Sequence, residues 1–253
     1  MRAESAAAAS FPTSLFPAPM PVTAGAPLTS LHDPRLQWTP HPPPAATAAG
    51  EGLAVVPRAG ADLWSRVGPA GGVAVKSDGA CLVAAVEGDR FVASVALGLH
   101  APHGWDQAGL AVRARGSAPA PSSSPSPWWL KACVERVPPS ATCAGPGGAA
   151  AVVAVSVTGA DGWTDQSTHP LTAGVPAVAR LRVAREGHSL AVYVGEEEAG
   201  GGVGWTRVRL ARAPGVPLAV GPYALAPLAA GCVATFREVE IRVLPGEGDG
   251  GRL

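Results

Sequence analysis

The chain has 253 residues, of which 47% are hydrophobic and 15% charged, and its 19 basic residues balance its 19 acidic ones. This balance excludes the basic surface that holds a phosphate backbone, so we expect no nucleic-acid partner. No segment approaches the run of about 20 apolar residues that crosses a membrane, so we expect no membrane span.

The four cysteines do not form a metal-binding or redox motif. Cys81, Cys133, Cys143 and Cys232 include no C-x-x-C pair, and their spacing fits no zinc module. We therefore predict buried thiols in a reducing compartment, and a Cys133–Cys143 disulfide stays open as the alternative. The chain contains no Asn and so no N-glycosylation acceptor. These features favour a cytoplasmic location.

The two ends of the chain have the composition of disordered segments. Residues 1–33 are rich in Ala, Ser and Pro, with too little apolar bulk to fold, and we interpret them as a disordered tail. An organelle transit peptide is the alternative, which would place the protein in an organelle. We expect the folded domain over residues 34–244 and a Gly-rich disordered tail at 245–253. The G-x-G-x-x-G pattern at 246–251 lies in that tail without a flanking strand or helix, so we predict no cofactor.

Short apolar runs separated by turn residues follow one another along the chain. Two three-residue links with Gly predict hairpins, one between 80–86 and 90–97 and one between 179–184 and 188–194. In the last apolar segment the apolar positions change from even to odd near Arg237, which predicts a β-bulge. Further strands are expected at 52–56, 62–64, 152–158, 205–210 and 231–243.

Two segments with strict alternation are central to the fold, WDQAGLAVR at 105–113 and WWLKACVE at 128–135. A period of two is the signature of a half-buried strand. The residues between them, 116–127, are rich in Ser and Pro and predict a flexible surface loop, so the two strands form a hairpin with an enlarged tip. The apolar residues that share one face are Ala108, Leu110, Val112, Leu130, Ala132 and Val134.

The two motifs resemble the DQAGL and WLK-G-E signatures of the regulation-of-enolase type of concanavalin A-like domain. Weaker matches follow in the same order, at 161–165, at Trp205 and at 220–236, where Ala226 and Cys232 depart from the family pattern. The resemblance covers roughly residues 35–243 and implies a concanavalin A-like jelly roll. Fungal relatives are linked by name to control of a glycolytic enzyme, so the resemblance also implies such an enzyme as a protein partner.

The strand pattern itself points to the same architecture. No segment shows a sustained helical period, and about a dozen short strands with turns between them predict an all-β, two-sheet antiparallel sandwich. A jelly roll is the arrangement by which such sheets limit exposed edges.

The polar positions of the two central strands are the first candidates for a binding site. They should all face away from the core, where a Trp ring could stack on a sugar while amides and charges bind its hydroxyl groups. A hydrogen-bonded, solvated sheet face without a ligand is the competing interpretation. Trp105 and Trp163 are further surface candidates, whereas we assign Trp64 and Trp205 to packing. The candidate residues on the polar face are Gln107, Arg113, Trp129, Lys131 and Glu135.

The acidic residues do not form a catalytic pattern. Glycoside hydrolysis needs two carboxyl groups that flank one bond, and the chain lacks the E-x-D-x-E triplet of jelly-roll glucanases. Asp106 and Glu135 lie on neighbouring strands but with opposite parity. His100 and His103 have no third ligand nearby, and Asp161 and Asp165 lack a calcium-loop pattern. We therefore predict neither an enzyme nor a metal site.

These observations favour a non-catalytic binding or regulatory module that binds a carbohydrate or a sugar phosphate on its polar sheet face. A glycoside hydrolase and a purely protein-binding scaffold are the alternatives. Ligand screening separates the binding module from the scaffold.

Overall fold

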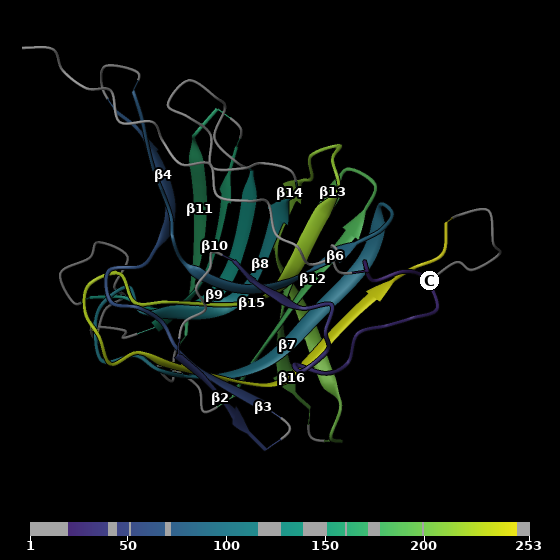
Figure 1. The fold of residues 1–253 in the computed structure, drawn as a ribbon, viewed down its shortest axis with the longest axis horizontal. Coiled ribbons are helices and arrows are strands. Elements are labelled where there is room, and N and C mark those ends of the chain that lie inside the picture. Colours follow the sequence, from purple (N-terminus) through teal and green to yellow (C-terminus); the bar gives the residue numbers. More distant parts are fainter. Residues whose placement is uncertain are drawn as a thin grey trace, which may run out of the picture.

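In the computed structural model, two seven-stranded antiparallel sheets pack face to face, and a separate two-stranded hairpin stands beside them (Figure 1). The structure describes residues 20–39, 45–50, 52–68, 72–115, 128–138, 151–159, 161–171, 178–198 and 200–246. None of these residues is helical, so within these ranges no helix is long and apolar enough to cross a membrane. The predicted all-β, two-sheet antiparallel sandwich is confirmed.

The strands are short and follow one another closely. Their bounds are β1 (Gln37–Thr39), β2 (Ala45–Ala49), β3 (Gly52–Val56), β4 (Leu63–Val67), β5 (Val73–Ser77), β6 (Ala80–Val86), β7 (Arg90–His100), β8 (Gln107–Ala114), β9 (Trp129–Arg136), β10 (Ala151–Thr158), β11 (Thr164–Pro170), β12 (Ala179–Glu186), β13 (Ser189–Glu197), β14 (Val203–Arg212), β15 (Leu218–Leu225) and β16 (Val233–Val243).

The order of the strands shows that neighbours in space are often distant in sequence. The first sheet has the order β1-β6-β15-β8-β9-β10-β11, and the second has the order β14-β13-β12-β7-β16-β3-β2. Strands β4 and β5 pair only with each other and form what we call the covering hairpin. In Figure 1, β4 lies beside β11 at one edge of the first sheet.

The central hairpin has the predicted antiparallel pairing. Strands β8 and β9 pair with Leu110 opposite Ala132 and Val112 opposite Leu130. All four side chains are fully buried in the core between the two sheets. Complete burial of one Leu side chain stabilises a fold by about 1.5–3 kcal/mol. Burial of the alternate apolar residues therefore determines which side of the hairpin faces the core. The predicted surface loop at 116–127 lies outside the described residues.

The predicted bulge in the last strand is confirmed. The register of β16 against β7 shifts between Phe236 and Glu238, so Arg237 is the extra residue. Phe236 before the bulge and Ile241 after it are both buried in the core, although their positions differ in parity. One inserted residue therefore keeps both halves of the strand facing the core.

Residues before the predicted domain boundary at residue 34 pack against the core. Val22, Leu28 and Leu31 are buried against the core, and the backbone of Leu28 exchanges two 2.8 Å hydrogen bonds with Ile241. These apolar residues are too widely spaced to produce a periodic signal, so composition alone suggested a tail. The rest of the predicted tails, residues 1–19 and 247–253, lies outside the described residues.

Several strands at sheet edges and in the covering hairpin have no counterpart in the sequence prediction. Strand β2 is exposed along its whole length, and β11 has the polar sequence TDQSTHP. Edge strands bury little of either face, so their sequences carry weak alternation. The predicted buried thiols are present at Cys81, Cys133 and Cys232, which are free, and Cys143 lies outside the described residues.

Candidate functional site

The predicted polar residues of the central hairpin lie together on the outer face of the first sheet. The register of β8 against β9 places Gln107 opposite Glu135 and Arg113 opposite Trp129. Lys131 has the same parity, and all five alternate with the core residues. The structure thus brings these five candidates onto one face, which we call the polar face.

This polar face is buried, whereas a sugar platform has to be open. The exposed fractions are 4% for Gln107, 8% for Lys131, 6% for Glu135 and 0% for Trp129. The indole of Trp129 therefore offers no surface on which a sugar ring could stack. Alternation predicts which residues share a face, but it carries no information about what covers that face.

The covering hairpin contributes to this burial. Leu63 at the start of β4 is buried in one apolar cluster with Tyr223 and Cys81 of the polar face. Ser65 is also buried, and its carbonyl accepts a 2.9 Å hydrogen bond from the hydroxyl of Thr164 on β11. The hairpin is thus joined to the edge of the first sheet by both apolar packing and hydrogen bonding.

The side chain of Gln107 is the centre of the hydrogen-bond network under the hairpin. Its amide nitrogen donates to Glu135 at 3.0 Å and to the carbonyl of Trp105 at 3.2 Å. Its amide oxygen accepts from the hydroxyl of Tyr223 at 3.0 Å and from Lys131 Nζ at 3.3 Å. The same oxygen also accepts from the thiol of Cys133 at 3.7 Å. These five partners use both ends of the amide, which fixes its orientation. The network joins β8, β9 and β15 across the face.

Two carboxyl groups and one ammonium group share this desolvated layer. Burial raises the pKa of Glu135 to about 7, which Lys131 partly opposes and Asp62 reinforces. Burial also raises the pKa of Asp62, again against the attraction of Lys131. One oxygen of Glu135 has no hydrogen-bond partner. A carboxyl group with a pKa near neutrality can act as a general acid or base, but only where a substrate reaches it.

Other groups at the polar face are also held away from solvent. Burial raises the pKa of Cys133 to about 12, so its thiol is not a nucleophile near neutral pH. Trp105 is half-buried and has a positive φ of 68°, a conformation that costs a non-Gly residue about 1–3 kcal/mol. Arg113 is half-buried, and one nitrogen of its guanidinium has no partner among the described residues.

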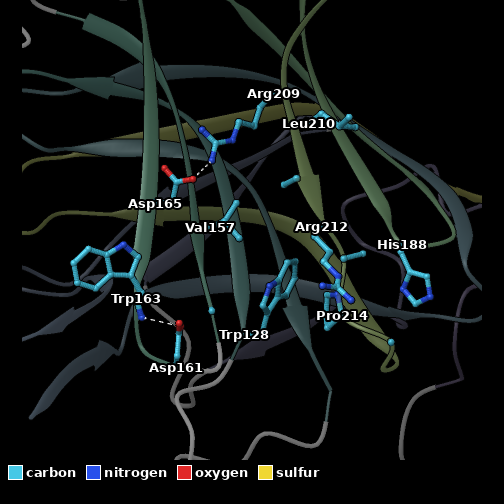
Figure 2. Close-up of a pocket in the computed structure, with 14 residues that line it drawn as sticks. Trp128, Val157, Asp161, Trp163, Asp165, His188, Arg209, Leu210, Arg212 and Pro214 are labelled. Carbon is cyan, nitrogen blue, oxygen red and sulfur yellow. Dashed lines mark hydrogen bonds and ion pairs between the residues drawn. The ribbon is translucent and has the colours of Figure 1, made fainter. Parts of the chain in front are cut away.

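A second candidate site, a groove at one edge of the sandwich, is open to solvent. We call it the edge groove, and its volume is about 590 Å³, within the range of small-molecule sites. It is lined by residues from β10 and β11 of the first sheet and from β14 of the second. Figure 2 shows Trp163 and Asp161 on one side, Arg212 and His188 on the other, and Trp128 between them.

Two contacts join the edges of the two sheets at this groove. Asp165 on β11 forms an ion pair with Arg209 on β14, as the dashed line in Figure 2 marks. His169 of β11 hydrogen-bonds with the carbonyl of Val208 on β14 at 3.1 Å. The groove therefore has walls from two different sheets that are fixed relative to each other.

The turn before β11 holds Trp163 at the mouth of the groove. Asp161 accepts a 3.1 Å hydrogen bond from the backbone N–H of Trp163. Gly162 between them has a φ of 82°, which glycine adopts without steric penalty. Trp163 is 61% exposed and Trp128 is half-buried. An exposed indole can stack on the apolar face of a sugar ring, and the carboxylate and guanidinium groups beside it can bind the hydroxyl groups of that sugar.

Of the seven predicted ligand-binding residues, Trp163 lines the edge groove and the others do not. The sequence analysis missed Trp128, Arg209, Arg212 and His188. The sequence did contain one signal for Trp128. Consecutive residues of a strand point to opposite faces, so Trp128 and Trp129 cannot lie on the same face of the sheet. Within the described residues, no group of three His, Cys, Asp or Glu side chains could hold a metal ion.

Two packed antiparallel sheets of this order define the chain as a jelly-roll β-sandwich domain. Residues 38–243 match the family described as "Protein of unknown function (DUF1349)", and the chain belongs to this family. No curated protein matches the sequence.

Several solved structures are similar to this chain. A functionally unknown protein from Saccharomyces cerevisiae is 24% identical, with 84% of this chain and 98% of that chain covered and a TM-score of 0.62. A bifunctional GH43-CE protein of Bacteroides eggerthii is 14% identical, with 84% of this chain but 24% of that chain covered and a TM-score of 0.52. The exoplasmic/lumenal domain of VIP36, solved with Ca²⁺ and Man3GlcNAc, is 14% identical, with 85% of this chain and 86% of that chain covered and a TM-score of 0.46. At these identities the likeness to the first two structures shows the fold alone.

Proposed function

We propose that this chain is a non-catalytic binding module that holds a carbohydrate in the edge groove. The observation that carries the proposal is the indole of Trp163, which is 61% exposed at the mouth of a groove of about 590 Å³. An exposed indole presents an apolar ring on which the apolar face of a sugar can stack. The flanking Asp161 and Arg212 supply acceptors and donors for sugar hydroxyl groups.

The polar face predicted from the sequence is a less suitable place for this ligand. A sugar ring would have to reach Trp129 and Lys131 beneath the covering hairpin, where both are at most 8% exposed. The edge groove needs no such rearrangement. We therefore assign the sugar to the groove and a stabilising role to the polar face.

Both carboxylates of the edge groove already have partners in the protein, which favours a role in binding rather than in catalysis. Asp165 is paired with Arg209, and Asp161 accepts the hydrogen bond from the turn. A hydrolase needs one carboxyl group free to protonate the leaving group and a second to act as base or nucleophile. Glu135 has the pKa of an acid catalyst, about 7, but lies under the hairpin.

The resemblance to regulation-of-enolase proteins extends the proposal to regulation. In this form, binding of a sugar or sugar phosphate controls a contact with a glycolytic enzyme in the cytoplasm. The purely protein-binding scaffold and the glycoside hydrolase remain the competing functions, and the experiment below distinguishes them.

The test is thermal unfolding of the full chain against a panel of oligosaccharides and sugar phosphates. A ligand at about 100 times its Kd stabilises by about 2.7 kcal/mol, or about 5–10 °C for a domain of this size. We expect Trp163→Ala to abolish the shift and Trp64→Ala, which removes an exposed indole from the covering hairpin, to retain it. Trp64 is 37% exposed and does not line the groove.

The other outcomes refute the proposal in different ways. A panel without any shift argues for a protein partner, which incubation with purified glycolytic enzymes then tests. A shift that survives Trp163→Ala places the sugar elsewhere. Release of shorter sugars, lost in Asp161→Asn or Asp165→Asn, argues for the hydrolase.

A further inference from the structure

A second hollow lies on the outer face of the second sheet, and its floor is a row of apolar residues with two Ala at its centre. The register sets Ala184 of β12 between Val92 of β7 and Ala191 of β13, and Ala191 lies opposite Leu210 of β14. All four line a cavity of about 310 Å³. The two Ala side chains at the centre of this row leave space because the neighbouring rows carry longer side chains.

Both neighbouring rows do carry longer, polar side chains. On one side, Glu186 lies opposite Arg90 and Ser189. On the other side, Tyr193 lies opposite Arg207. The cavity therefore has an apolar floor and hydrogen-bonding rims, an arrangement typical of small-molecule sites.

The charges around this cavity are predominantly positive. Two guanidinium groups, those of Arg90 and Arg207, line it together with the carboxylate of Glu186, which gives a net charge of one positive unit. The Glu186 side chain is 69% exposed and lies 3.7 Å from Arg90, so it compensates little of that charge.

Arg185 also borders the cavity but adds no charge to it. Its side chain has the parity of the core residues Leu181 and Val183, and its guanidinium donates to the backbone carbonyls of Gly187 at 2.9 Å and Pro214 at 3.3 Å. The cationic groups that an anion in the cavity can meet are therefore those of Arg90 and Arg207.

We propose that this cavity binds a small organic carboxylate whose apolar body rests on Ala184 and Ala191. The carboxylate is held by the guanidinium of Arg207 and the hydroxyl of Tyr193, for which the described residues provide no hydrogen-bond partner. Arginine suits this role because its planar guanidinium matches a carboxylate with two parallel hydrogen bonds. The site shares Leu210 with the edge groove but does not depend on carbohydrate binding there.

The experiment is titration of the full chain with benzoate, followed by calorimetry and by chemical shifts in NMR spectra. Benzyl alcohol supplies the same ring without the charge, and inorganic phosphate supplies a charge without the ring. We expect saturable binding of benzoate that is at least about tenfold weaker for each of the other two probes, since one ion pair of about 1.4 kcal/mol corresponds to tenfold.

Three variants locate the site. Arg207→Gln removes the cation, and Ala191→Leu fills the floor from the solvent side without touching the core. We expect both to weaken benzoate binding at least about tenfold, with thermal unfolding confirming that each variant is folded. Arg237→Gln removes an exposed guanidinium at the bulge of β16 and should leave binding unchanged.

The inference fails if benzoate does not saturate, if benzyl alcohol binds equally well, or if Ala191→Leu binds as tightly as the natural chain. Trp163→Ala should retain full benzoate binding. A loss of benzoate binding in Trp163→Ala would also overturn the assignment, because it would place the anion in the edge groove.

Discussion

Replacement of Glu135 by Gln tests whether the covering hairpin buries an ionisable carboxyl group. In the unfolded chain this group has its ordinary pKa of 4.5, whereas burial raises the pKa to about 7 in the folded chain. Between these values the folded state binds more protons than the unfolded state. The free energy of unfolding therefore falls as the pH rises from about 4.5, and it levels off above about 7.

The size of this effect follows from the two pKa values. At about 1.36 kcal/mol per unit, the shift from 4.5 to about 7 corresponds to about 3 kcal/mol. About 2.5 kcal/mol of it is lost between about pH 5 and about pH 8. The amide of Glu135→Gln stays neutral and can still accept the hydrogen bond from Gln107. We expect the stability of this variant to fall by about 2.5 kcal/mol less than that of the natural chain over the same range.

The assay is urea unfolding at several values between about pH 5 and about pH 8, followed by Trp fluorescence. Glu196→Gln removes an exposed carboxylate of β13 and should keep the pH dependence of the natural chain. Parallel curves for Glu135→Gln and the natural chain would refute the reasoning. In that case the carboxyl group would be hydrated, and the polar face would be open to ligands after all.

Two further predictions test the network and the core. Tyr223→Phe removes the hydroxyl that donates to Gln107 at 3.0 Å. It should cost about 1–2 kcal/mol in urea unfolding because a buried hydrogen bond is lost. An unchanged midpoint would contradict the network. Leu110→Ala should cost about 2–5 kcal/mol because it opens a cavity in the core, whereas Leu210→Ala, at a side chain that is 59% exposed, should change stability by about 0.5 kcal/mol or less. Equal losses in the two Leu variants would show that Leu110 does not lie in the core.

Features of the fold that depend on alternation could be predicted from the sequence. The central hairpin, its inward Leu110 and Leu130, and the bulge at Arg237 all follow from the parity of apolar residues along single strands. The contribution of residues 22–31 could not be predicted in this way. Their burial depends on contacts with β6 and β16, which are remote in sequence, rather than on any local period.

The candidate site could likewise be predicted only in part from the sequence. Parity placed Gln107, Lys131 and Glu135 together, but their burial depends on the covering hairpin, whose β5 strand carries no predicted pattern. The edge groove is formed where β11 meets β14, and the ion pair between Asp165 and Arg209 spans 44 positions of sequence. Contacts between sheets are set by the packing of whole layers, which single-strand patterns do not encode.

The outer faces of the two sheets are stabilised in different ways, and this difference determines where a ligand can reach the molecule. The first sheet buries its polar residues, and Gln107 binds five partners that offset their desolvation. The second sheet keeps its polar residues at the surface, where Arg180 pairs with Glu238 at 2.6 Å and Arg182 lies 3.8 Å from the ring of Trp205. Exposed pairs of this kind contribute little stability, so residues there can change without loss of the fold. Recognition is therefore expected at the edge groove and on the second sheet, whereas the conspicuous motif of the central hairpin serves the architecture.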